Sequence, residues 1–116
     1  MLTLPYTFKF YFFSQPVDMR KTFNGLHLLI MSDVEAKEFP GRMYIFLNKR
    51  RDKVKVFYWD NDGFAIWYKQ LEKGLFEFPK SDQKYLEISA EILHQIFLGF
   101  KLNSLKKNFR FTLTSL

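Results

Sequence analysis

Residues 43–70, MYIFLNKRRDKVKVFYWDNDGFAIWYKQ, carry the strongest structural pattern in the chain, because apolar runs alternate with short polar segments. The apolar runs lie at residues 43–47, 54–59 and 64–69. Their β-branched and aromatic side chains favour strands. The polar segments between them, residues 48–53 and 60–63, have the composition of turns. Because short turns join antiparallel neighbours, this stretch predicts an antiparallel β-meander.

The flanking segments extend the meander and add two helices. The aromatic run at residues 8–13 predicts a further strand, and residues 75–78 predict another. Residues 19–32 carry apolar side chains at helical spacing behind Asp18, which suits an N-cap. A second helix follows Ser89, and its apolar stripe consists of Ile92, Leu93, Ile96, Phe97 and Phe100. The predicted fold class is α+β, a small antiparallel β-meander covered on one face by two helices.

The composition bounds the classes to which the protein can belong. With 116 residues, 47% of them hydrophobic, the chain can form one domain over residues 1–116, with a basic tail at residues 101–116. It has no cysteine, so thiolate metal sites, disulfides and cysteine nucleophiles are excluded. No apolar run approaches the roughly 20 residues of a membrane span, and the N-terminus is a poor signal peptide. We therefore expect a soluble, cytoplasmic protein without a cofactor.

Positive charge is concentrated in two segments. Of the net charge of +6, residues 42–55 contribute +5 and residues 99–116 contribute +4. Residues 1–41 are neutral, and residues 56–98 contribute −3. Two basic segments are typical of a protein that binds a polyanion, and nucleic acid is the polyanion that we expect. The alternative is that these cations only keep the domain soluble.

Two segments match a known protein family in order and spacing. Residues 18–26 are DMRKTFNGL, close to the family signature DMRKGFDGL. In residues 43–79 the matching positions are Phe46, Arg51, Asp52, Lys55, Trp59, Asp60, Gly63, Lys69, Leu71, Glu72, Gly74, Phe76 and Pro79. Residues 88–102 are similar to the family's closing helix. The chain thus resembles, over nearly its whole length, the small accessory protein that insertion sequences of family sixty-six encode, often labelled TnpB.

The resemblance implies a role in DNA transposition beside a separate transposase, and it implies no catalytic residue. The chain departs from the family pattern at Thr22, Asn24, Gln70 and Phe78, where the family has Gly, Asp, Arg and Trp. The label TnpB also belongs to an unrelated RNA-guided nuclease, for which this chain is far too short.

The loop at residues 48–53 is the first candidate for contact with DNA. It holds four basic side chains within the five positions 49–53, and phosphate groups would neutralise their mutual repulsion. The alternative is a solvated hairpin in which Asp52 braces an arginine.

The strand that follows this loop is the second candidate. Alternation puts Lys55, Phe57 and Trp59 on one face, opposite a face of valines that suits a core. Cations beside aromatic rings resemble a sheet surface on which bases stack. Phe57 and Trp59 could equally lie under a helix.

The start of the first predicted helix is the third candidate. Arg20 and Lys21 in its first turn oppose the helix dipole, which favours a bound anion at that position. Asp18 could instead pair with Arg20. The full set of predicted DNA-binding residues is Arg20, Lys21, Arg42, Lys49, Arg50, Arg51, Lys53, Lys55 and Trp59.

The acidic and histidine side chains give little support to an enzyme. Asp60 and Asp62 with Glu72 could chelate Mg²⁺, but the first two belong to an ordinary turn sequence. His27 and His94 have no second ligand at metal-binding spacing. We therefore predict a non-catalytic accessory protein that binds DNA and the transposase of its element, with no metal, membrane or small-molecule substrate. The alternative is a protein-interaction module that docks on the transposase without touching DNA, and a metal-dependent nuclease ranks third.

Overall fold

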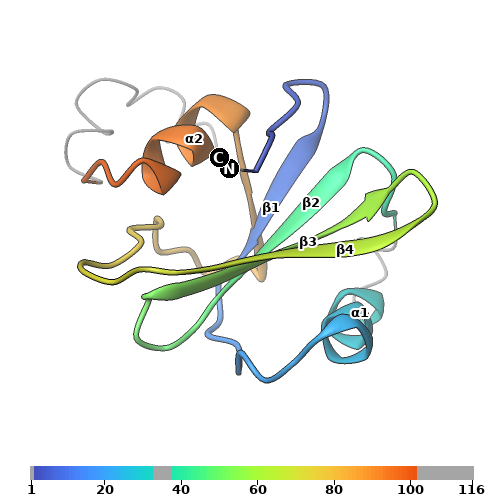
Figure 1. Ribbon diagram of the computed structural model, residues 1–116, viewed down its shortest axis with the longest axis horizontal. Helices are drawn as coiled ribbons and strands as arrows, with labels where there is room; N and C mark the ends of the chain where they lie inside the picture. Colours follow the sequence, from blue (N-terminus) through green and yellow to red (C-terminus); the bar gives the residue numbers. More distant parts are fainter. Residues whose placement is uncertain (1, 33–37, 102–116) are drawn as a thin grey trace.

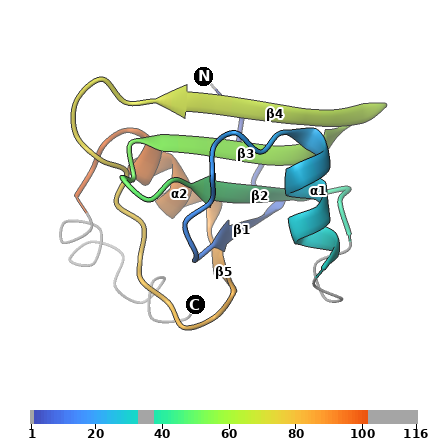
Figure 2. The same ribbon diagram turned by 90° about the horizontal axis from the view of Figure 1, so that it is seen from below.

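The computed structural model of the protein describes residues 2–32 and 38–101. The elements in chain order are β1 (Lys9–Phe13), α1 (Phe23–Met31), β2 (Arg42–Leu47), β3 (Lys53–Asp60), β4 (Gly63–Gln70), β5 (Tyr85–Ile88) and α2 (Ala90–Phe97). The strands form a sheet in the order β4-β3-β2-β1-β5 (Figures 1 and 2). Apart from Lys101, the predicted basic tail lies outside the described residues.

The α+β class and the meander are confirmed, because β2, β3 and β4 follow one another as antiparallel neighbours. β1 is parallel to β2 and antiparallel to β5, so the sheet as a whole is mixed. Parallel neighbours need a crossover connection, and α1 lies in the crossover from β1 to β2. The prediction that both helices cover one face is wrong, since α1 and α2 lie on opposite sides of the sheet (Figures 1 and 2).

The alternation of side chains along the strands divides the core into two layers. On the α2 face the strands bury Phe10, Phe12, Met43, Ile45, Leu47, Val54, Val56, Leu86 and Ile88 against Ile92, Leu93, Ile96 and Phe97. On the α1 face they bury Phe13, Tyr44, Phe46 and Phe57 against Leu26 and Ile30. Because both faces of β1 and β2 are covered, residues 10–13 and 43–47 are continuously apolar rather than alternating.

The connection from β4 to β5 corrects a second prediction. Residues 75–78 form no strand, although Phe76 and Phe78 are buried in the core on the α2 face. The additional strand is β5, in which Leu86 and Ile88 are buried and Glu87 between them is exposed. The aromatic residues at 76 and 78 therefore belong to a loop that packs on the core. The alternation of buried and exposed residues in β5 extends over only four residues, which is too short to indicate a strand in the sequence.

The second helix is capped as predicted. The side chain of Ser89 accepts a hydrogen bond from the backbone N–H of Ile92 at 3.2 Å. Gly99 follows the helix with a φ of 91°, a left-handed conformation that glycine adopts without steric cost.

The first helix begins later than predicted. Its N-cap is Thr22, and the helix starts at Phe23 instead of residue 19. Asp18 is therefore not the N-cap, and Arg20 and Lys21 precede the helix instead of forming its first turn. The argument from the helix dipole does not apply to these two cations, and their surroundings decide what they do.

Candidate nucleic-acid interface

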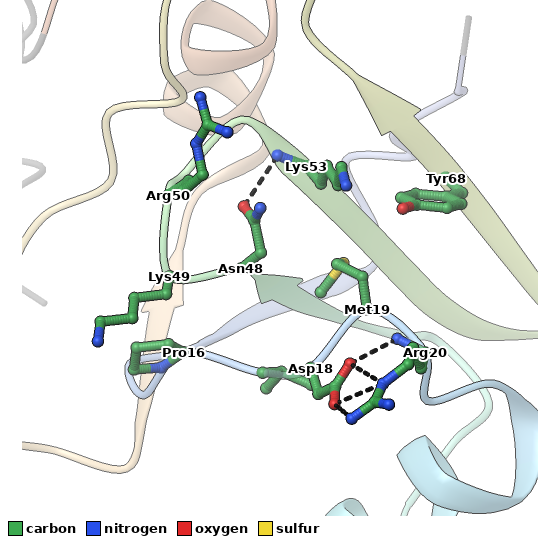
Figure 3. Close-up of a pocket in the computed structure, with 10 residues that line it drawn as sticks. Pro16, Asp18, Met19, Arg20, Asn48, Lys49, Arg50, Lys53 and Tyr68 are labelled. Atoms are coloured by element: carbon green, nitrogen blue, oxygen red, sulfur yellow. Dashed lines mark hydrogen bonds and ion pairs between the residues drawn. The ribbon is translucent and has the colours of Figure 1, made fainter.

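The segment before α1 and the hairpin loop between β2 and β3 lie together at one end of the sheet (Figure 3). Between them is an open hollow of about 480 Å³. It is lined by Pro16, Val17, Asp18, Met19, Arg20, Asn48, Lys49, Arg50, Lys53 and Tyr68. Four of these side chains are cations and one is an acid, so we call the site the basic hollow. Two candidates that lie about 30 positions apart in the chain thus form one surface.

Asp18 and Arg20 form a charged turn on one wall of the basic hollow. The Asp18 carboxylate accepts hydrogen bonds from the Arg20 backbone N–H at 2.9 Å, from Nε at 3.0 Å and from Nη2 at 2.7 Å. The side-chain hydrogen bonds from Arg20, helped by the backbone one, lower the pKa of Asp18 from 3.8 to about 2. The alternative interpretation, that Asp18 pairs with Arg20, is therefore correct. The Arg20 side chain is 92% exposed, so its remaining guanidinium N–H groups are accessible to an anion.

Asn48 organises the hairpin on the other wall. Its Oδ1 accepts a hydrogen bond from the backbone N–H of Lys53 at 2.9 Å, and its Nδ2 donates to Asp52 at 2.6 Å. The hydrogen bond from Asn48 lowers the pKa of Asp52. The Asn48 carbonyl accepts from the N–H of Arg51, whose φ is 63°. The acid in this loop is therefore held by an amide, and the loop is a tight turn with one left-handed residue.

The hairpin loop is also fastened to the connection that follows β4. The carbonyl of Arg51 accepts a hydrogen bond from the N–H of Phe76, and that of Asp52 accepts one from Leu71, both at 2.7 Å. Hydrogen bonds inside and outside the turn thus fix its backbone. The basic side chains extend from a rigid support, which reduces the conformational entropy that a bound ligand would have to remove.

Lys55 has a different position from the predicted one. We expected its side chain on an exposed surface, but it is 4% exposed on the α1 face. Its ammonium donates hydrogen bonds to the carbonyls of Met19 and Lys21, each at 2.7 Å, and lies 4.7 Å from the centre of the Tyr68 ring. Burial lowers the pKa of Lys55. Lys55 therefore holds the segment on either side of Arg20 against the sheet, and its charge is not available to DNA.

The other predicted residues divide between the two ends of the sheet. Lys21 follows Arg20 and is exposed, but it does not line the basic hollow. Its Cβ and Cγ would lie 3.1 Å from a Cβ at Gly25. Arg51 lines a neighbouring hollow of about 230 Å³, to which Lys80 also contributes. The loop at residues 48–53 therefore presents cations on two sides.

Arg42 and Trp59 lie at the opposite end of the sheet, where β2 begins and β3 ends. Arg42 Nη2 pairs with Glu38 Oε2 at 3.1 Å, and its guanidinium lies 5.1 Å from the centre of the Tyr11 ring. Trp59 is half-buried and meets Phe64 edge to face, with 5.0 Å between ring centres. The alternative that places rings of this strand in the core is correct for Phe57, which is buried. Arg42 and Trp59 do not contribute to the basic hollow.

The acidic and histidine side chains form no metal centre in the described part of the chain. Asp60 and Asp62 lie at the hairpin turn before β4, and no group of three or more His, Cys, Asp or Glu side chains could hold a metal ion among residues 2–32 and 38–101. His27 stacks on Phe39, with 5.2 Å between ring centres. Within the same residues, neither helix has the length and apolar composition to span a bilayer.

Among the lining residues that the predicted set lacks, Asn48 and Tyr68 have uncharged polar side chains. Tyr68 lies directly opposite Lys55 in the β3–β4 register, so the two side chains share a face of the sheet, and only the register shows this. Asn48 does carry a signal in the sequence, because an asparagine at the first position of a tight turn often forms side-chain hydrogen bonds to the backbone. Both residues shape the hollow without carrying charge.

Comparisons with known proteins find one family model and two relatives that match the chain. Residues 8–107 match the family model described as IS66 Orf2 like protein. The uncharacterized protein y4jC of Sinorhizobium fredii is 34% identical over 94 residues, which cover 81% of this chain and 80% of the relative. The uncharacterized protein y4hO of the same organism is 26% identical over 82 residues, 71% of each chain. No solved structure matches the chain.

Proposed function

The chain belongs to the family of IS66 Orf2-like proteins, which have an accessory role in transposition, and from this premise we propose that it binds DNA through the basic hollow and is not itself an enzyme. The proposal puts the protein in the cytoplasm, with the DNA and the transposase of its element as partners. Backbone phosphates, rather than base edges, are the expected ligands, because the cations lie on a wide, open surface.

The observation that supports this proposal is that Arg20, Lys49, Arg50 and Lys53 all line one hollow. Asp18 is the only acid among the lining residues, and Arg20 already neutralises it. The hairpin cations that line the hollow, Lys49, Arg50 and Lys53, form no ion pair with an acid in the described contacts. Asp52 is hydrogen-bonded to Asn48 and remains a charged neighbour of Arg50 and Lys53, so it offsets only part of their charge. An excess of positive charge on a fixed backbone suits a polyanion, and each phosphate contact would release bound counterions.

A salt titration of duplex DNA binding tests the proposal. We expect Lys49→Ala with Arg50→Ala to weaken binding and to reduce the slope of log K against log salt by about 0.9 for each lost contact. The matched control is Lys9→Ala with Lys84→Ala, which removes two exposed charges that do not line the hollow. Equal losses in both double variants would mean that net charge alone drives binding, and unchanged binding in the first would exclude the hollow.

The absence of catalysis has its own test. Purified protein with Mg²⁺ or Mn²⁺ should leave supercoiled DNA uncut, because Asp60 and Asp62 are placed as turn residues without a third acidic ligand in the described residues. Cleavage that is lost in Asp60→Ala, with an unchanged circular dichroism spectrum, would contradict this part of the proposal.

A second candidate function, docking on the transposase, is favoured by the outer surface of α1. The helix, FNGLHLLIM, contains no Asp, Glu, Lys or Arg, and Phe23, Leu28 and Met31 are 47%, 68% and 39% exposed. Leu28 and Met31, three residues apart, lie on one side of the helix, and adjacent exposed apolar side chains are typical of a protein contact. Leu28→Glu should therefore weaken binding to the transposase and leave the affinity for naked DNA unchanged, whereas Lys49→Ala with Arg50→Ala should do the reverse.

A further inference from the structure

β4 forms one edge of the sheet. It pairs with β3 on one side, and no strand in the described part of the chain pairs with its other side. The strand is eight residues long, and the residues from Gly63 to Trp67 are only half-buried. An edge of this length presents a row of backbone N–H and C=O groups to which a further strand can bind.

The features that usually protect an edge strand are weak in β4. It contains no proline, and its register with β3 continues without a bulge from Gly63 to Gln70. Its one charged residue, Lys69, is next to last. β5 at the other edge has only four residues, and Glu87 is one of them. Since short strands and central charges discourage pairing, β4 is the edge that is suited to accept a partner.

The two ends of β4 carry opposite charge. Asp60 and Asp62 are exposed at the turn before the strand, and Lys69 and Lys73 are exposed at its other end, where Glu72 is the one nearby acid in sequence. The seven steps from Asp62 to Lys69 span about 23 Å in a strand, so these two charges do not interact within one chain. In an antiparallel pair of two β4 strands, the acidic end of each copy would meet the basic end of the other. Such self-complementarity is what a twofold interface requires.

We propose that two copies of this chain associate by antiparallel pairing of their β4 strands. Directly opposite residues in such a pair point to the same face of the sheet, so their numbers differ by an even number. In a symmetric register, one residue of β4 therefore lies opposite the same residue of the other copy. Centred on Ile66, it places Phe64 of one copy opposite Tyr68 of the other, a pairing of aromatic side chains that stabilises sheets. The two sheets become one continuous sheet.

The pairing also determines the orientation of the two copies relative to each other. Its twofold axis is perpendicular to the sheet, so the α1 faces of both copies, and the basic hollow on each, point to the same side. A dimer would therefore present two basic hollows to one DNA molecule. This consequence rests on the proposed function, whereas the association of β4 strands does not.

Sedimentation velocity of the full chain without DNA, over a wide range of concentrations, tests the association. We expect a monomer–dimer equilibrium in the wild type, and a dissociation constant roughly two- to fivefold higher in Asp62→Lys and in Lys69→Asp. In the register centred on Ile66, Lys69 of one copy lies opposite Gly63 of the other, next to Asp62 but not directly opposite it. Each change therefore turns two symmetry-related attractions between neighbouring exposed charges into repulsions. The double variant should recover the wild-type constant. Recovery needs a second copy, since the two positions are too far apart to interact within one chain.

Lys84→Asp and Glu87→Lys, at the β5 edge, are the matched controls and should leave the dissociation constant unchanged. A wild-type chain that stays monomeric at every concentration overturns the proposal, and so does a dimer that is not weakened by the single changes or not recovered by the double one. Hydrogen exchange of the wild-type chain tests the association without any substitution. The backbone amides of β4 should exchange more slowly at high protein concentration. Equal exchange rates at all concentrations would also overturn the proposal. DNA binding is measured separately on the monomer, so the two proposals can fail independently.

Discussion

The burial of Lys55 leads to a quantitative prediction for Lys55→Met, which keeps the length of the side chain and removes its ammonium. The ammonium donates two hydrogen bonds of 2.7 Å, to the carbonyls of Met19 and Lys21, from a side chain that is 4% exposed. A hydrogen bond from a charged group contributes about 1.5–3 kcal/mol, so the two together contribute roughly 3–6 kcal/mol. Relief from burying a charge offsets part of the loss. We therefore expect the free energy of unfolding to fall by about 2–4 kcal/mol.

Urea denaturation followed by tryptophan fluorescence measures this change. The matched control is Lys53→Met, two residues earlier on the same face, where the side chain is half-buried. The control should change the unfolding free energy by no more than about 0.5 kcal/mol. If Lys55→Met costs as little as the control, the two hydrogen bonds do not contribute to the fold and the argument is refuted.

The same variant separates positioning from direct contact with DNA. Arg20 lies between the two residues whose carbonyls Lys55 binds, so the loss of the ammonium should release the segment that carries this guanidinium. Under conditions where Lys55→Met is folded, we expect its DNA affinity to fall. The slope of log K against log salt should decrease only by the amount that corresponds to the one phosphate contact of Arg20. A drop in affinity that persists unchanged in an Arg20→Ala background would show that Lys55 does not act through Arg20.

Three further predictions concern local structure. A carboxyl NMR titration should give Asp18 a pKa of about 2 that returns toward 3.8 in Arg20→Ala. Because the folded pKa is the lower one, the stability from this pair is present above about pH 4 and is lost as the pH falls toward about 2. Gly25→Ala should raise the free energy of unfolding by less than the ~1 kcal/mol that helix propensity offers, because the new Cβ would lie 3.1 Å from Lys21 side-chain carbons. Urea denaturation measures this change, and the full increase would show that the contact is harmless. Ser89→Ala should cost about 1 kcal/mol in the same assay, because Ser89 caps α2, and no loss would mean that water replaces the cap.

The sequence predicted most of the elements because their signals are local. The meander follows from turn residues between apolar runs, and the cap of α2 follows from Ser89 alone. The side of the sheet on which each helix lies is not a local property. It depends on β1 pairing with β2 in parallel, and both strands have apolar side chains on their two faces, so no pattern within either strand indicates its partner.

The candidate site shows the same division between local and non-local information. The charge of the loop at residues 48–53 can be counted in the sequence. That this loop lies beside Arg20 cannot be read from the sequence, because the pairing of strands in the sheet is what brings the two segments together. Lys55 was misplaced for a related reason. Alternation put it on the correct face with Phe57, yet only the fold shows that the segment around Met19 covers that face.

Lys55 also connects the two segments that carry the family resemblance. Residues 18–26 and 43–79 are separate in the chain, and the ammonium of a strand residue in the second segment binds the backbone of the first at two carbonyls. A buried ammonium with two carbonyl partners is favourable only while both stay in place, since removal of either leaves a buried donor unsatisfied. The segment that carries Arg20 is therefore held in one position relative to the hairpin that carries Lys49, Arg50 and Lys53. The buried Lys55 thus keeps the exposed cations of the basic hollow in a fixed arrangement. A count of positive charge in the sequence gives buried and exposed cations equal weight, although the first hold the fold together and the second are available to a ligand.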